Sequence, residues 1–174
     1  MRIGSRTLAS CAGIAAVVSL TTVAAQVPAP KVTQSARQIP GITTKDAFPN
    51  GCVDCHTSTA RGGDTRMSTL MATWTTAVEP ALVARAKASA ADPAKVKGKH
   101  PTVPRPGANV PQACMAACHR KGSTLAPAFS TLMHNLHLTG AQNQFLVLYQ
   151  GECTHCHKLD PKTGAWRMPS GAEK

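Results

Sequence analysis

Three short stretches of this chain repeat one order of cysteine and histidine. They are Cys52-Val53-Asp54-Cys55-His56, Cys114-Met115-Ala116-Ala117-Cys118-His119 and Cys153-Thr154-His155-Cys156-His157. A cysteine pair followed at once by histidine is the attachment signature of c-type haem. Residues three and four apart share one face of a helical turn, so both thiols can bond one porphyrin while the histidine reaches its iron. The sequence therefore predicts three covalently bound haem c groups.

Other uses of a cysteine pair explain the motifs less well. Zinc sites, thiol redox pairs and disulfides also need paired cysteines, but none of them requires histidine at the next position. The chain has only 7 histidines in 174 residues, so three such placements by chance are improbable. The middle motif carries one extra residue, which turns a helical position by about 100°. Its backbone is therefore expected to depart from the usual turn.

The N-terminus has the pattern of an export signal. Residues 1–25 combine a basic start, a short apolar stretch and Val23-Ala24-Ala25 as a cleavage site. Cys11 is expected to leave with this segment. Residues 26–49, rich in Pro, Thr, Gln and Ser, are expected to form an extended or disordered leader, and residues 50–174 to form the haem domain. The apolar stretch is too short for a convincing membrane span, so we expect a periplasmic protein without stable membrane insertion.

The positive charge of the chain does not by itself indicate nucleic-acid binding. Without residues 1–25 the chain keeps 17 Lys and Arg against 8 Asp and Glu, a formal charge of +9. Six haem propionates would offset most of that excess. The remaining cations form either a docking patch for an acidic redox partner or a solvated face. They include Arg85, Lys87, Lys95, Lys97, Lys99 and Arg105.

Hydrophobic periodicity predicts a few helices separated by coil. Met67, Leu70, Met71, Trp74 and Val78 recur at helical spacing. A second helix is expected after Pro80, and a third from Pro127 to Gly140. The apolar run 145–149 fits strand or helix equally, while residues 91–111 and the tail after His157 should be irregular.

The chain is poor in the side chains that normally build a core. Residues 26–174 hold six aromatics against 24 Pro and Gly. Haem can replace the missing aromatic side chains, so we expect a mostly α fold with extensive coil, organised around the haems, and an apoprotein that does not fold.

Six histidines are the predicted iron ligands: His56, His119 and His157 from the motifs, and His100, His134 and His137 from elsewhere. His134 and His137 lie three apart on the expected helix, so they can hold two neighbouring haems. His155 is expected to pack on a propionate or a neighbouring haem. Methionine is the competing ligand. The candidates are Met67, Met71, Met115, Met133 and, foremost, Met168.

Residues 50–168 resemble the class III, or small multihaem, cytochromes c. The repeated motifs, the short chain per haem and the His134-x-x-His137 pair upstream of Cys153 carry the resemblance. The resemblance implies bis-histidine irons, a His134/His137 pair that supplies distal ligands to two different haems, and low-potential electron transfer in the periplasm. The long stretch between His56 and His100 and the extra residue of the middle motif depart from the family pattern.

The expected function is electron transfer between redox proteins rather than enzymatic catalysis. A membrane quinol-oxidising cytochrome and a terminal or outer-membrane reductase are the expected partners, and assembly into a larger electron conduit is a further alternative. The main alternative is an enzyme or gas sensor with one open iron that binds nitrite, hydroxylamine, peroxide or nitric oxide. That alternative rests on His100, because a histidine in a Pro-rich loop need not reach an iron.

Overall fold

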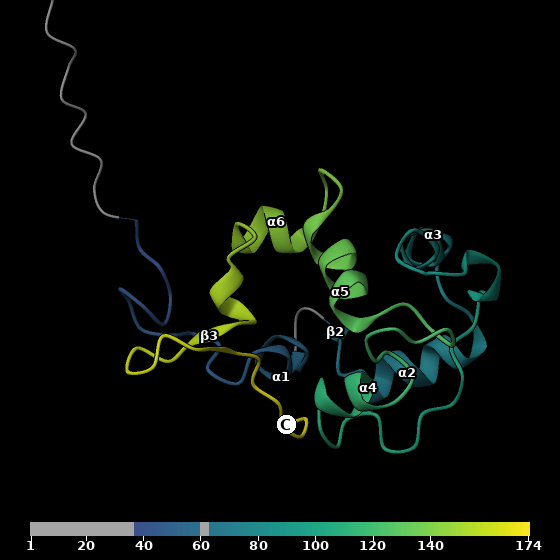
Figure 1. Cartoon of the computed structure of the whole chain (residues 1–174), viewed down its shortest axis with the longest axis horizontal. Helices are drawn as coiled ribbons and strands as arrows, with labels where there is room; N and C mark the ends of the chain where they lie inside the picture. The colour runs from purple at the N-terminus through teal and green to yellow at the C-terminus, as the bar shows by residue number, and fades with distance from the viewer. Residues whose placement is uncertain (1–36, 60–62) are drawn as a thin grey trace, which may run out of the picture. The chain divides into compact units, whose positions relative to one another are not determined.

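Short helices joined by long irregular segments make up the described chain (Figure 1). The computed structural model describes residues 37–59 and 63–174. The predicted signal segment, Cys11 and the first part of the leader lie outside these residues. Within them the α-helices are α1 (Cys52–Cys55), α2 (Met67–Thr76), α3 (Pro80–Ala88), α4 (Gln112–Ala116), α5 (Phe129–Leu138) and α6 (Gln144–Tyr149).

Two 3₁₀ turns and two small hairpins complete the described secondary structure. The turns are η1 (Pro93–Lys95) and η2 (Cys153–His155). Strand β1 (Ser58–Thr59) pairs antiparallel with β2 (Gly63–Asp64), and β3 (Lys158–Leu159) pairs antiparallel with β4 (Trp166–Arg167). The mostly α class predicted from the sequence is thus confirmed at this level. The tail after His157 is mostly loop, as predicted, apart from the two-residue pairing of β4 with β3.

The predicted helices appear where the apolar periodicity placed them. Helix α2 begins at Met67, and the carboxylate of Glu173 accepts hydrogen bonds from the backbone N–H and the hydroxyl of Ser68 at 2.7 and 2.6 Å. Helix α3 begins with Pro80, whose fixed φ suits the first helical position. The ambiguous run 145–149 is helical, because the side chain of Asn143 caps α6 at the N–H of Phe145.

Very few side chains form a conventional core. Among the described residues, only Val53, Val110, Phe129 and Leu132 are buried large apolar side chains. Helix α5 packs against α3 on one side and α6 on the other. This is little apolar burial for a chain of this length.

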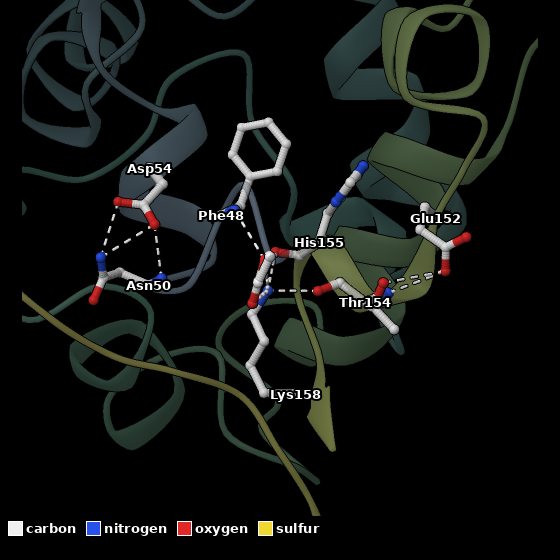
Figure 2. Close-up of polar contacts among 8 residues, drawn as sticks. Phe48, Asn50, Asp54, Glu152, Thr154, His155 and Lys158 are labelled. Carbon is white, nitrogen blue, oxygen red and sulfur yellow. Dashed lines mark hydrogen bonds and ion pairs between the residues drawn. The ribbon is translucent and has the colours of Figure 1, made fainter. Parts of the chain in front are cut away.

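Both ends of the described chain contact its interior. Lys158 is buried, and its ammonium lies 2.9 Å from a carboxylate oxygen of Asp46 (Figure 2). The ring of Phe48 packs edge-on against His155 with centroids 4.7 Å apart. At the other end, Lys174 reaches Asp54 at 2.8 Å. Residues 37–49 therefore contact the rest of the unit, while the domain boundary at residue 50 stays a prediction.

No helix in the described ranges has the length and apolar character that crossing a bilayer requires.

Candidate functional site

The three cysteine motifs share one backbone closure. The histidine N–H of each motif donates to the carbonyl of its first cysteine: His56 to Cys52 at 2.8 Å, His119 to Cys114 at 3.1 Å, and His157 to Cys153 at 2.9 Å. The bond spans four residues in the outer motifs and five in the middle one. The extra residue is absorbed at Ala117, whose φ of −100° and ψ of −115° lie outside the helical region. The middle motif thus closes like the others through a wider turn.

The first motif is held rigidly from both sides. Gly51 precedes α1 with φ 62°, a conformation that favours glycine. Both carboxylate oxygens of Asp54 accept hydrogen bonds from Asn50 (Figure 2), and the intervening Val53 is buried. These contacts fix the short helix that carries Cys52 and Cys55.

The two cysteines of the first motif have raised thiol pKa values. All six motif cysteines are free thiols in the structure. Burial, with a smaller contribution from Cys156, raises the pKa of Cys52 and of Cys55 to about 11. A reactive thiol pair needs the opposite shift, so the first motif does not have the character of a thiol redox pair.

Each motif histidine faces one of the three other predicted ligands. The ring centroids of His56 and His137 are 6.2 Å apart. Those of His100 and His119 are 6.1 Å apart, as are those of His134 and His157. The sequence predicted these six residues but not their pairing.

The spacing fits two imidazoles bound to opposite sides of one iron. With metal–nitrogen bonds of about 2.0 Å and a ring centre about 1.1 Å behind each nitrogen, collinear ligands have centroids about 6.2 Å apart. The three observed separations fall within this range. In the described part of the chain no cluster of three or more His, Cys, Asp or Glu side chains could hold a metal ion. A haem iron needs only two, because the porphyrin supplies four nitrogens.

Backbone carbonyls orient four of the six rings. The Nδ1 atoms of His56, His119, His100 and His137 lie 2.9, 2.7, 2.8 and 3.0 Å from the carbonyl oxygens of Thr65, Pro127, Pro101 and Met133. A carbonyl only accepts, so each Nδ1 carries the proton and each Nε2 keeps a free lone pair. This is the usual outer-shell arrangement of a metal-bound histidine. No sequence pattern predicted these acceptors.

Burial keeps the motif histidines in the form that binds metal. It lowers the pKa of His56, His119 and His157, and a nearby histidine adds to the shift in each case. A neutral imidazole has a lone pair for iron, whereas a protonated one does not. His157 and His134 have no carbonyl acceptor for Nδ1 among the described residues, so their pair is less constrained than the other two.

His155 occupies an aromatic cage instead of a ligand position. Its ring is 7% exposed and lies edge-on to Phe48, Phe145 and Tyr149. Its Nδ1 is the single buried side-chain polar atom without a partner in the described chain. Phe145 also packs edge-on against His137. The cage therefore links His155 of the third motif to His137, the histidine that faces the first motif. The predicted contact of His155 with a propionate or haem stays a prediction.

The first and third motifs lie side by side. A Cβ atom added to Gly51 would be 3.5 Å from the carbonyl oxygen of Cys156, which is ordinary van der Waals contact. On the opposite side of both sites, His137 and His134 come from the same helix α5. The middle motif joins this group at the start of α5, where the N–H of Phe129 donates to the carbonyl of His119 at 2.9 Å.

Comparison with known proteins gives no relative. No family model, no curated protein and no solved structure matches this chain.

Proposed function

We propose that this chain is an exported electron-transfer protein that carries three c-type haems, each with two histidine ligands. The observation that carries the proposal is the pairing of His56 with His137, His119 with His100, and His157 with His134 at ring separations of 6.1 to 6.2 Å. Each of the three motif histidines has one of the three other histidines opposite it, so none of the six predicted ligands lacks a partner. The small core supports the same proposal, because three macrocycles would supply the missing apolar volume.

Each bound haem supplies an iron that gains and loses one electron without making or breaking a bond. The chain does the rest. Its cysteines would hold the porphyrin covalently, and its paired histidines would bind the iron. The carbonyls of Thr65, Pro127 and Pro101 fix ring tautomers and orientations, so the ligands change little between oxidation states. Two histidines per iron favour low potentials relative to a methionine ligand.

Close haem sites suit rapid electron exchange within the molecule. His134 and His137 are one helical turn apart on α5 and face different motifs. Such residues have Cβ atoms about 5–6 Å apart. Together with the contact between Gly51 and Cys156, this places the first and third sites next to one another. Partners on either side would be a membrane quinol-oxidising cytochrome and a terminal or outer-membrane reductase in the periplasm.

The alternative with an open iron has less support. It was motivated by His100, whose loop gave no assurance that it reaches an iron. The ring of His100 lies nearly parallel to that of His119 with centroids 6.1 Å apart, and the backbone N–H of His100 donates to the carbonyl of Trp74 at 2.8 Å. These contacts favour a filled site over one open to nitrite, peroxide or nitric oxide, and we propose no enzymatic activity.

The proposal is tested by counting haems. The full chain is expressed with a c-type haem maturation system, and its intact mass is measured together with its pyridine haemochrome spectrum. The proposal expects three haems in the native chain and two in Cys114→Ala/Cys118→Ala. A mature chain of bare polypeptide mass, or one that contains zinc or disulfides, would overturn it.

A further inference from the structure

The exposed cations of the chain gather around one of the three histidine pairs. Three lysines precede His100 and Arg105 follows it, while Arg120 and Lys121 follow His119. Since the rings of His100 and His119 are 6.1 Å apart, the two groups meet at one site. We call the six exposed side chains together the basic face: Lys95, Lys97, Lys99, Arg105, Arg120 and Lys121.

The charges of the basic face are almost uncompensated. Among its six members only Lys95 has a carboxylate within ion-pair distance in the described structure, Asp92 at 3.6 Å. Lys97 donates to the carbonyl of Ala94 at 2.8 Å. Near the third motif two cations have carboxylate partners, Lys158 with Asp46 and Arg37 with Glu152, whereas Lys45 and Lys162 are exposed. The two regions therefore present different electrostatic surfaces.

Apolar surface lies beside these cations. Leu125 is 73% exposed, and its loop lines a small cavity together with Lys95 and Val96. A shallow groove of about 390 Å³ lies on the neighbouring segment and is lined mainly by Val78, Pro80, Val83 and Ala84, with Lys87 and Gly98. Gly98 lies between Lys97 and Lys99. An apolar centre with a charged rim is the usual anatomy of a protein–protein interface.

Arg85 does not belong to this surface, although the sequence grouped it with the same cations. Its guanidinium donates to the carbonyl of Leu136 at 2.9 Å, between α3 and α5. It therefore stabilises helix packing.

We propose that the basic face is the docking surface for an acidic redox protein. This inference rests on the proposed function, because the face is useful for electron transfer only if His100 and His119 hold a haem. Uncompensated cations steer an acidic partner to this site and raise the association rate. The apolar surface beside Leu125 then supports a small, short-lived complex of the size typical of redox encounters. A protein partner is favoured over a lipid surface because the cations border one redox site instead of following one face of a long helix.

Charge reversal tests the proposal with a matched pair of variants. Lys97→Glu/Lys121→Glu alters the basic face without touching a histidine. Lys45→Glu/Lys162→Glu changes the net charge equally through exposed lysines outside the basic face. The probe is a plant-type ferredoxin, an acidic protein of low potential. Binding of the oxidised proteins is measured by calorimetry, and electron transfer from reduced ferredoxin by stopped flow, both at low and high salt.

The proposal expects Lys97→Glu/Lys121→Glu to weaken binding and slow the reaction roughly tenfold at low salt, with the difference shrinking at high salt as charges are screened. The control should change either quantity less than about twofold. Equal losses in both variants, or none in either, would overturn the proposal. So would binding to phosphatidylglycerol vesicles that depends on Lys97 and Lys121 while the ferredoxin reaction does not.

The haem count distinguishes failure of the proposed function from failure of the docking inference. A chain without haem fails the proposed function and this inference together. A three-haem chain whose ferredoxin binding ignores the Lys97→Glu/Lys121→Glu change fails the docking inference alone.

Discussion

The imidazole rings of His56 and His137 face one another at 6.2 Å with their planes almost perpendicular, at 88°. The stacked rings of His100 and His119 differ in orientation by only 18°, and those of His134 and His157 by 53°. The angle between axial planes decides how the two ligands donate into the iron d orbitals. Perpendicular rings leave two of these orbitals nearly equal in energy, whereas parallel rings split them. If each pair holds one haem iron, as we propose, the three irons would differ electronically.

Electron paramagnetic resonance of the oxidised protein should resolve these differences. The account predicts a strongly anisotropic low-spin signal with a large gmax from the His56–His137 site, and an ordinary rhombic signal from the His100–His119 site. His137→Ala should remove the first signal and His100→Ala the second. Loss of the rhombic signal in His137→Ala would contradict the pairing.

Removing one distal histidine should open one iron. We expect His137→Ala to let carbon monoxide shift about one third of the reduced haem signal, since the other two irons keep both ligands. His134→Ala should do the same at the third motif. The matched control is His155→Phe, which retains a ring in the aromatic cage of Phe48, Phe145 and Tyr149. Carbon monoxide binding by this control would mean that His155 is a ligand after all.

The pair formed by Lys158 and Asp46 should be important for stability. The Lys158 and Asp46 side chains are 8% and 20% exposed, and the ammonium also donates to the carbonyl of His155 at 3.4 Å. Lys158→Met leaves a half-buried carboxylate unpaired, so we expect the free energy of unfolding of the holoprotein to fall by about 2–4 kcal/mol. Asp46→Asn should cost less, because Lys158 keeps its carbonyl acceptors. Guanidinium unfolding that gives equal losses would show that the ion pair contributes little.

Acid should weaken the ion pair of Glu152, the residue that precedes Cys153, with Arg37. Partial burial opposes ionisation of this carboxyl, but hydrogen bonds from Thr154 and the nearby guanidinium of Arg37 lower its pKa below the ordinary value. A lowered folded-state pKa stabilises the protein above the ordinary glutamate pKa, and this stability is lost as pH falls through the folded value. The stability of Glu152→Gln should therefore fall less than that of the native chain over this acidic window. Stability is measured by urea unfolding at several acidic pH values. An equal loss of stability in Glu152→Gln and in the native chain would contradict this role of Glu152.

The local features of the site could be predicted from the sequence because they depend on neighbours along the chain. The motif spacing identified all six cysteines, and apolar periodicity placed α2, α3 and α5. The run 145–149 stayed undecided because its outcome depends on the Asn143 cap, a single side-chain hydrogen bond. The departure from a regular turn at the middle motif followed from residue counting alone, and Ala117 carries it.

The pairing of histidines could not be predicted because it depends on contacts between distant segments. His100 lies in a Pro-rich segment without periodicity, and its place opposite His119 depends on hydrogen bonds of residues 98–100 with the end of α2. The contact of Asp46 with Lys158 joins residues more than a hundred positions apart, in a stretch whose composition is typical of disorder. The carbonyl acceptors of the rings are backbone atoms, which every residue has.

Locating the irons tests the central claim most directly. An experimental structure of the mature protein, phased on the anomalous scattering of iron, would show where each metal lies and which nitrogens bind it. The account predicts three iron peaks, lying between His56 and His137, between His119 and His100, and between His157 and His134. An iron with a single histidine, a different pairing, or a methionine opposite any motif histidine would contradict it.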